Sequence, residues 1–353
     1  MSREIEMAVS RRALLRGGFT VTAMGVLGTS TAPLAFGEVG ARAVDRPRIH
    51  TCSEWGARPP NGTITVENHK PTYIVVHHTA GGNSSDTSLA HAYQISRGIQ
   101  NFHMDGRGWI DSGQQLTNSR GGHITEGRHR SVEILDGGTR HVQGANVGNH
   151  NSEVIGIENE GLYSTVDVPV ALWNSLVQLV AYIAQSYGIS PDMIRGHRDF
   201  NATECPGQVL YERLPELIAA VRAALGTSPA SPAAPLRSWP LLKPGEQSDK
   251  VLAAQHLLRA RGVAVKADGV FGDATFAAVA RLAAENGVAY EPCYASRSAD
   301  ESGFVGVTTW PLLVRTVRAG DTGEAAQAAR VLMSARGERF ATVDTPTWQR
   351  LLA

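Results

Sequence analysis

The feature that most constrains this fold is a set of three possible metal ligands divided between two distant segments. His77 ends a short apolar run that begins at Tyr73, and His197 and Cys205 lie far downstream. Two imidazoles and one thiolate give a zinc ion three ligands and leave the fourth tetrahedral position for water, as in catalytic zinc sites. Taken alone, His77 is more typical of a hydrogen-bonded core histidine and Cys205 of a buried thiol. A metal site requires the two segments to meet.

Alternating strand-like and helix-like segments predict an α/β layered fold. The predicted strands are short and apolar, and the predicted helices carry apolar residues at spacings of three and four. Pro169 is placed to open one helix, and Gly188 is placed to close it. The predicted strands are Tyr73–His78 and Val154–Glu158, and the predicted helices are Ser88–Phe102, Pro169–Tyr187 and Tyr211–Leu225.

Groups suited to acid–base chemistry occur on the second predicted strand and near Cys205. Strand alternation places Glu158 and Glu160 on one face, with Asn159 opposite. A carboxylate at the end of an apolar strand has the setting of a general base, although a solvated strand end is the simpler alternative. Thr203, two positions before Cys205, is placed to donate a hydrogen bond to a developing oxyanion, or simply to cap a loop.

The N-terminus predicts an export signal over residues 1–43. Arg11 and Arg12 form a twin-arginine pair, and an uncharged stretch from Gly17 to Gly37 follows. A basic helix start and an uncleaved membrane anchor are the alternatives. No other stretch approaches the roughly 20 apolar residues of a membrane span. The formal net charge of zero argues against nucleic acid as a partner.

The remaining chain divides at a Pro/Ala/Ser-rich segment, residues 226–238, which predicts a semi-extended linker. Residues 44–225 form the first predicted domain. Beyond the linker, Leu242–Gly262 recurs loosely as Val317–Gly337, and each copy later reaches a Thr-Trp pair. The Asp268–Thr275 motif occurs only in the first copy. We therefore expect a three-helix unit over 239–316 and a truncated repeat over 317–353.

The three cysteines, an odd number, indicate that one thiol has a separate role. Cys205 is the candidate for metal binding. Cys52 and Cys293 could then form a disulfide in an oxidising compartment, or remain as two inert buried thiols.

Seven short motifs follow one another between Cys52 and Leu217. They are Glu54–Arg58, Val75–Ala80, Ile99–Met104, Gly108–Asp111, Thr125–Arg128, Ile155–Glu158 and Gly196–Gly207. Through these motifs, in this order, the segment resembles the zinc-dependent N-acetylmuramoyl-L-alanine amidases, a family that includes the amidase-type phage lysozymes and the peptidoglycan recognition proteins. The resemblance implies a mixed central sheet flanked by helices with a zinc cleft. It also implies Zn²⁺ bound by His77, His197 and Cys205, with His78 only a neighbour.

Several positions depart from the family's pattern. Gln114 stands where phage and animal enzymes have a catalytic tyrosine, and glutamine cannot act as a base. Glu158 matches the glutamate of the cell-wall-recycling amidases, and Thr203 replaces the lysine that accompanies it there. The resemblance therefore implies Glu158 as the base and Thr203 as the oxyanion donor. Asn146 replaces a histidine of the substrate rim, and Arg128–Gln143 is expected to be a long specificity loop.

The region after the linker resembles the small all-α peptidoglycan-binding domain of wall hydrolases, through its Asp268-Gly269 and Thr309-Trp310 motifs. Together the resemblances imply a secreted, monomeric hydrolase that acts in the cell wall. It would use zinc-activated water to cleave the amide between N-acetylmuramic acid and L-alanine of peptidoglycan, with no membrane partner after signal cleavage. A non-catalytic peptidoglycan-recognition protein and a structural zinc protein are the alternatives. Gln114 favours the former, and the latter would need a fourth ligand.

Overall fold

The computed structural model describes residues 43–227, 239–288, 300–338 and 341–353. The expected twin-arginine signal therefore lies almost entirely outside the described residues, as do most of the expected linker and Cys293. Within the described residues, no helix combines the length and apolarity that crossing a membrane requires.

The first part of the chain alternates strands and helices, as its sequence predicts. The strands are β1 (Ile49–His50), β2 (Val66–Glu67), β3 (Tyr73–His78), β4 (Leu116–Asn118), β5 (Ile124–Glu126), β6 (His141–Val142), β7 (Val154–Asn159) and β8 (Ile194–Gly196). The helices are α1 (Cys52–Trp55), α2 (Leu89–Asn101), α3 (Ser131–Gly137), α4 (Val170–Tyr187), α5 (Gln208–Glu212) and α6 (Leu214–Ala224). A π-helical turn, Phe102–Gly106, extends α2, and 3-10 turns at Pro191–Met193 and His197–Asp199 flank β8.

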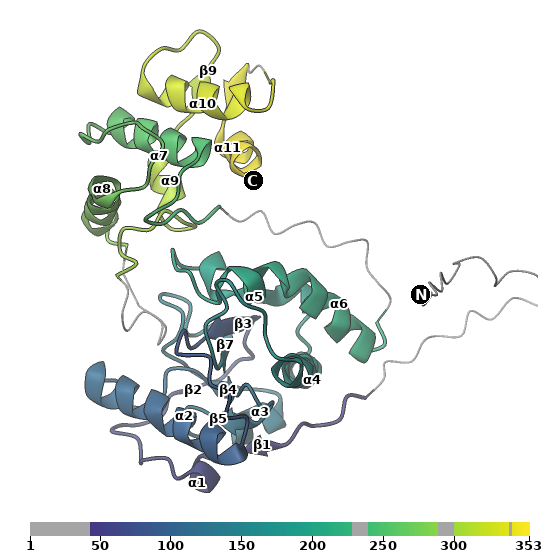
Figure 1. Ribbon diagram of the computed structural model, residues 1–353. Coiled ribbons are helices and arrows are strands. Elements are labelled where there is room, and N and C mark those ends of the chain that lie inside the picture. Colours follow the sequence, from purple (N-terminus) through teal and green to yellow (C-terminus); the bar gives the residue numbers. More distant parts are fainter. Residues whose placement is uncertain (1–42, 228–238, 289–299, 339–340) are drawn as a thin grey trace, which may run out of the picture. The chain divides into compact units, whose positions relative to one another are not determined.

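Six strands form one mixed sheet in the order β1-β5-β4-β7-β3-β8 (Figure 1). Only β4 and β5 pair in antiparallel fashion, and the other pairs are parallel. Strand β3 lies between β7 and the edge strand β8. Its His77 is in register with Glu158 of β7, and its Val76 is in register with Gly196 of β8. This topology brings the two distant segments of the sequence to one end of the sheet.

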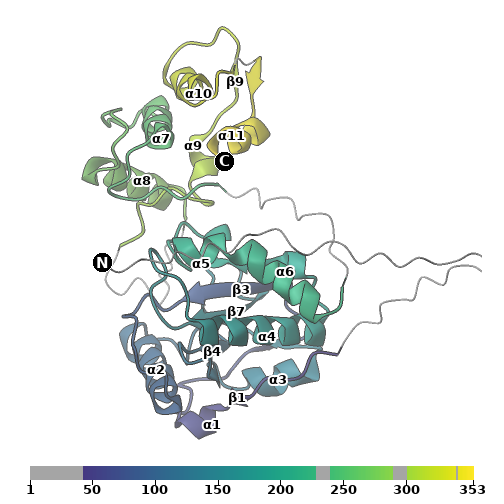
Figure 2. The same ribbon diagram turned by 45° about the vertical axis from the view of Figure 1, so that its right-hand side comes forward.

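One face of the sheet packs against α4 and α6 (Figure 2). Strand alternation directs Ile74, Val76, Ile155 and Ile157 to this face, where they are almost fully buried. The apolar side of α4 meets them, and Gly188 ends that helix in the left-handed conformation with a φ of 71°. Burial of each leucine or isoleucine side chain contributes about 1.5–3 kcal/mol, so this face forms the main core. The α4 residues in it are Leu172, Leu176, Leu179, Val180, Ala181, Tyr182, Ile183, Ala184 and Tyr187.

The opposite face of the sheet carries polar side chains and is covered by α2 only at its β5 end. Ser96 of α2 bonds to Thr125 of β5, with 2.8 Å between their hydroxyl oxygens. The alternation that buries Ile74 and Val76 directs His77 and Glu158 to this polar face. His77 and Glu158 therefore lie together on the face opposite the main core.

Two expectations from the sequence differ from the structure. The helix expected over Tyr211–Leu225 is interrupted at Arg213, between α5 and α6. Pro215 at the start of α6 explains the break, because a proline inside a continuous helix removes a hydrogen bond and clashes with the preceding turn. The loop expected over Arg128–Gln143 contains α3 and β6, and Arg128 is buried, donating to the Ser112 carbonyl at 2.7 Å.

The C-terminal part is mainly helical and has a core of its own. Two tryptophans show that its internal repeat is structural. The indole of Trp310 donates to the Pro240 carbonyl at 2.7 Å, and that of Trp348 donates to the equivalent Arg315 carbonyl at 2.8 Å. The two copies share one core rather than forming separate ones. Its elements are α7 (Asp249–Ala260), α8 (Asp273–Glu285), α9 (Trp310–Leu313), β9 (Val317–Arg318), α10 (Glu324–Ser334), β10 (Thr342–Val343) and α11 (Thr345–Leu352).

Candidate metal centre

The structure brings His77, His197 and Cys205 together on the polar face of the sheet. Their ligand atoms all lie within 4.8 Å of one another, and all three residues are buried. His77 Nδ1 is 3.6 Å from Cys205 Sγ, and the two imidazole rings are 4.6 Å apart between centroids. A tetrahedral zinc ion with bonds of about 2.0–2.3 Å would fit between atoms at these separations.

Strand ends and a short turn position the three side chains. His77 is the penultimate residue of β3, and His197 follows β8 directly in a 3-10 turn. The Arg198 amide donates to the Cys205 carbonyl at 3.1 Å, which closes the loop between the two downstream ligands. The amide of His78 donates to Cys205 Sγ at 3.4 Å. The loop therefore folds back on β3 as the sequence spacing allows.

Both imidazoles are held neutral by their surroundings. Burial, together with the neighbouring His197 and His78, lowers the pKa of His77 well below its ordinary value. Burial lowers the pKa of His197 to about 4, against an opposing hydrogen bond from Asn201. Neutral imidazole is the form that binds metals. Both rings are therefore ready to accept a cation near neutral pH.

The polar atoms of the cluster are consistent with a metal ion. His197 Nδ1 and His77 Nε2 are buried and have no hydrogen-bond partner within the described residues. A buried polar group without a partner is costly, and an ion at the His197 nitrogen would remove that cost. Two nitrogens and a thiolate suit zinc, whereas calcium and magnesium prefer oxygen ligands. His78 is not part of the cluster, because its Nδ1 accepts from the Tyr163 amide at 3.3 Å.

Glu158 lies beside the cluster on the neighbouring strand. It is buried, and it is in register with His77 on one side and with Thr117 of β4 on the other. Gln114 approaches the same strands, since its Nε2 donates to the Thr117 hydroxyl at 2.9 Å. Gln114 Oε1 is buried and has no partner within the described residues. Thr117, which Gln114 contacts, is thus the β4 partner in register with Glu158.

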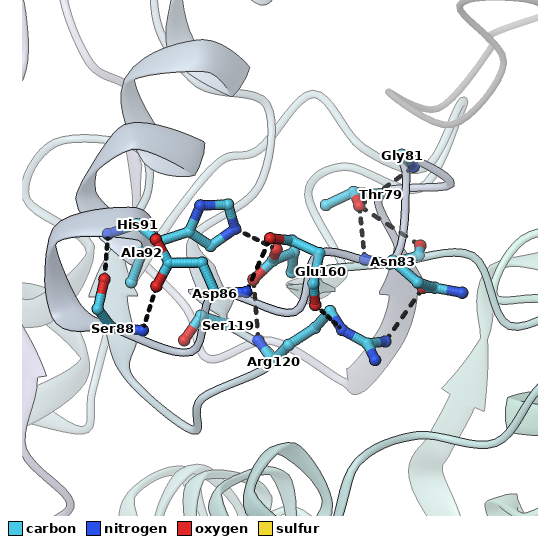
Figure 3. A network of polar contacts seen from close by, with 12 residues as sticks. Thr79, Gly81, Asn83, Asp86, Ser88, His91, Ala92, Ser119, Arg120 and Glu160 are labelled. Atoms are coloured by element: carbon cyan, nitrogen blue, oxygen red, sulfur yellow. Dashed lines mark hydrogen bonds and ion pairs between the residues drawn. The ribbon is translucent and has the colours of Figure 1, made fainter.

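Thr203 and Glu160 make contacts of a structural kind. The Thr203 hydroxyl accepts from the Cys205 amide at 3.1 Å, in the way of a loop-capping residue. Glu160 lies just beyond β7, and its carboxylate contacts His91 Nε2 at 2.6 Å and accepts from the Arg120 amide at 2.9 Å (Figure 3). Glu160 thus belongs to a polar network that does not include the metal cluster.

The polar network around Glu160 also includes the loop that follows β3 after His78. Thr79 accepts from the Gly161 amide at 2.8 Å, and Asn83 exchanges two hydrogen bonds with the backbone of Leu162. The Arg120 guanidinium donates to Asn83 and to the Ser84 carbonyl. The loop after β3 is therefore tied to the loop after β7, which keeps the end of β3 rigid.

Two asparagines influence the imidazoles. The sequence did not single out Asn201, and it placed Asn146 only at the expected substrate rim. Asn201 Oδ1 is 3.0 Å from His197 Nε2, and the Asn146 side chain opposes the lowering of the His77 pKa. The signal for Asn201 was its spacing four residues after His197 within a short turn. Asn146 gave no local signal, because it reaches His77 only through the packing of its loop on β7.

The fold and this cluster of three possible metal ligands can now be compared with known proteins. Residues 67–208 match the family model of the N-acetylmuramoyl-L-alanine amidases. Peptidoglycan-recognition protein SC2 of Drosophila melanogaster is 33% identical over 175 residues, which are 49% of this chain and 88% of that protein. The N-acetylmuramoyl-L-alanine amidase of Sus scrofa is 29% identical over 170 residues, 48% of this chain but 27% of that protein.

Among solved structures, that of Drosophila PGRP-LB is similar, with 27% sequence identity and a TM-score of 0.42. The match covers 47% of this chain and 92% of that chain. The chain belongs to the family of N-acetylmuramoyl-L-alanine amidases and peptidoglycan-recognition proteins.

Proposed function

We propose that this protein is a zinc-dependent N-acetylmuramoyl-L-alanine amidase that cleaves the amide between N-acetylmuramic acid and L-alanine in peptidoglycan. The observation that carries the proposal is the buried His77, His197 and Cys205 cluster, with its ligand atoms within 4.8 Å of one another. Three protein ligands leave a coordination position open for catalysis. The relatives named as amidases support the reaction class.

A zinc ion bound by these three residues would polarise the carbonyl of the substrate amide and would lower the pKa of a bound water to about 7. The remaining chemistry belongs to the side chains around it. Glu158 is placed on the strand beside His77, where its carboxylate takes a proton from the attacking water and passes it to the departing amine of L-alanine. Thr203 is the proposed donor to the oxyanion, and its hydroxyl already fixes the Cys205 amide. Water is consumed, and a carboxylic acid and a free amine form.

Digestion of purified peptidoglycan tests the proposal. Zinc-loaded protein is expected to release new L-alanine amino termini and intact lactyl groups, both identified by mass spectrometry. Protein treated with a chelator is expected to release neither, and added zinc is expected to restore the cleavage. Cleavage at another bond, or equal cleavage with and without metal, would reject the assignment.

A non-catalytic peptidoglycan-recognition protein is the second candidate, and Gln114 is the observation that favours it. Gln114 cannot act as a base, and it stands where phage and animal enzymes have a catalytic tyrosine. The same digestion separates the two candidates, because a recognition protein would bind peptidoglycan without producing new ends.

We also propose how the flanking regions serve this activity. Residues 1–43 would direct export by the twin-arginine route, which carries folded proteins, so that the enzyme acts as a secreted wall protein. The domain boundaries would fall at 44–225 and 239–353, with residues 226–238 as linker. The C-terminal part would hold the enzyme on its polymer and raise the local substrate concentration.

A further inference from the structure

Each imidazole of the metal centre has an asparagine carboxamide beside it. His197 Nε2 lies 3.0 Å from Asn201 Oδ1, and its buried Nδ1 has no partner within the described residues. On His77, Nδ1 faces Cys205 Sγ, so Nε2 is the outer nitrogen. The Asn146 side chain opposes the lowering of the His77 pKa that burial causes. The two rings therefore present the same nitrogen, Nδ1, to the metal position.

The orientation of the Asn146 carboxamide follows from the partners of its nitrogen. Asn146 Nδ2 donates to the Gly113 carbonyl at 3.0 Å and to Gln115 Oε1 at 3.2 Å. With both N–H groups engaged, the carboxamide must turn its oxygen the other way. Asn146 Oδ1 is buried and has no other partner within the described residues, and the same holds for His77 Nε2. The acceptor Asn146 Oδ1 and the possible donor His77 Nε2–H are thus both buried and without another partner within the described residues.

The sheet makes room for this oxygen above β7. A Cβ on Gly156 would lie 2.3 Å from Asn146 Oδ1, so the carboxamide rests directly on the glycine. Gly156 is in register with Val75. This pair lies two residues before the pair of His77 and Glu158, and therefore on the same face of the sheet. Gln115 Oε1 also accepts from the Gly156 amide at 2.7 Å. Gln115 and Gly156 together hold Asn146 beside the ring.

We propose that Asn146 is a positioning residue for His77, whose Nε2–H group donates to Asn146 Oδ1 and whose Nδ1 lone pair is thereby aimed at the metal. Asn201 does the same for His197. Ligating histidines commonly donate their second ring N–H to a fixed acceptor, which sets the tautomer and the ring orientation. Asn146 therefore acts on the metal ligand rather than at the substrate rim. The inference rests on the proposed zinc site.

Zinc affinity tests the role without any substrate. The Asn146→Leu variant removes the acceptor while it keeps the branched heavy-atom skeleton, and it is expected to bind zinc about 10- to 100-fold more weakly. The dissociation constant is measured by competition with a chromophoric chelator, and the visible absorption bands of the Co²⁺-loaded variant are expected to shift. Asn201→Leu is expected to act similarly. Asn101→Leu, on an exposed part of α2, is the matched control. Wild-type zinc affinity and wild-type cobalt bands in Asn146→Leu would overturn the proposal.

A second measurement uses the wild-type protein, so it stands even if a variant fails to fold. Nitrogen-15 spectra of the histidines in the zinc-loaded protein are expected to show a protonated Nε2 on both His77 and His197. Zinc bound through Nε2 of His77 would overturn the proposal. Normal zinc binding without amide cleavage would reject the proposed function and leave this inference intact. A wild-type protein that binds no zinc would reject both.

Discussion

At the scale of single residues, the candidate site combines two neutral imidazoles and a cysteine with one buried carboxylate. Burial keeps His77 and His197 neutral, so a metal ion would enter without competing strongly with protons near neutral pH. Glu158, in register with His77, is the nearest proposed acid–base group. Of the proposed metal ligands, His77 therefore lies on the strand adjacent to that of the proposed base.

The first residue-scale prediction concerns Glu158. Replacing Glu158 with Gln keeps the shape but removes the base, so turnover on peptidoglycan is expected to fall about 10²- to 10⁴-fold. Zinc content, measured by atomic absorption, is expected to remain at the wild-type level because Glu158 is not a ligand. A variant that digests cell walls at the wild-type rate would show that another group is the base.

The second prediction concerns the ion pair of His129 with Asp111. The hydrogen bond to the Asp111 carboxylate, 2.8 Å from Nδ1, raises the pKa of His129 against the opposing effect of burial. A raised folded-state pKa gives stability that is complete below the unfolded pKa of about 6.5. This stability is lost as the pH rises through the folded value.

The His129→Gln variant is therefore expected to lose about 1 kcal/mol more stability at pH 5.5 than at pH 8.5. Urea unfolding of variant and wild type at both pH values measures the difference. His150→Gln removes an exposed surface pair with Glu153 and serves as the control. A loss that is equal at the two pH values would mean that the charge on His129 does not stabilise the fold.

At the scale of secondary-structure elements, β7 has no room for a side chain at position 156. A Cβ there would collide with Asn146, which two donated hydrogen bonds hold in place. The Gly156→Ala variant is expected to lose about 1–3 kcal/mol of stability by overpacking, and to bind zinc more weakly. Gly82→Ala is the matched control, since nothing lies within 4 Å of its added Cβ. Thermal unfolding and zinc titration of both variants measure these effects.

The elements that the sequence predicted well are those with a strong local pattern. The helix at Pro169–Tyr187 was predicted to within one residue, with Pro169 as the N-cap rather than the first helical residue. The strand at Tyr73–His78 was predicted with its full bounds. The interruption before Pro215 was missed because the apolar spacing continues across it.

The arrangement of the site was only partly accessible from local patterns. The histidines and the cysteine at or after the ends of predicted strands indicated which side chains would meet at one end of the sheet. The contacts of Asn146 depend on strand register and on the packing of the loop before β7, neither of which a local pattern contains. Glu160 was expected on the same face as Glu158, but β7 ends at Asn159 and Glu160 instead enters the network of His91 and Arg120.

At the scale of the whole molecule, the described residues contain two separate large cores. One includes β3, β7 and α4, and the other includes α7, α10 and both Trp310 and Trp348. No residue is shared between these two clusters. Since each part buries its own apolar side chains, we expect the first part to fold without the second.

Removal of residues 239–353 tests whether the first part catalyses the reaction and the C-terminal part attaches the protein to the cell wall. The truncated protein is expected to keep its turnover of a short soluble muropeptide, because His77, His197, Cys205 and Glu158 all lie in the first part. Its binding to insoluble cell walls, measured by co-sedimentation, is expected to fall at least tenfold, because tethering raises the effective concentration of substrate without changing the site. An equal loss on both substrates would mean that the C-terminal part supports catalysis itself rather than attachment.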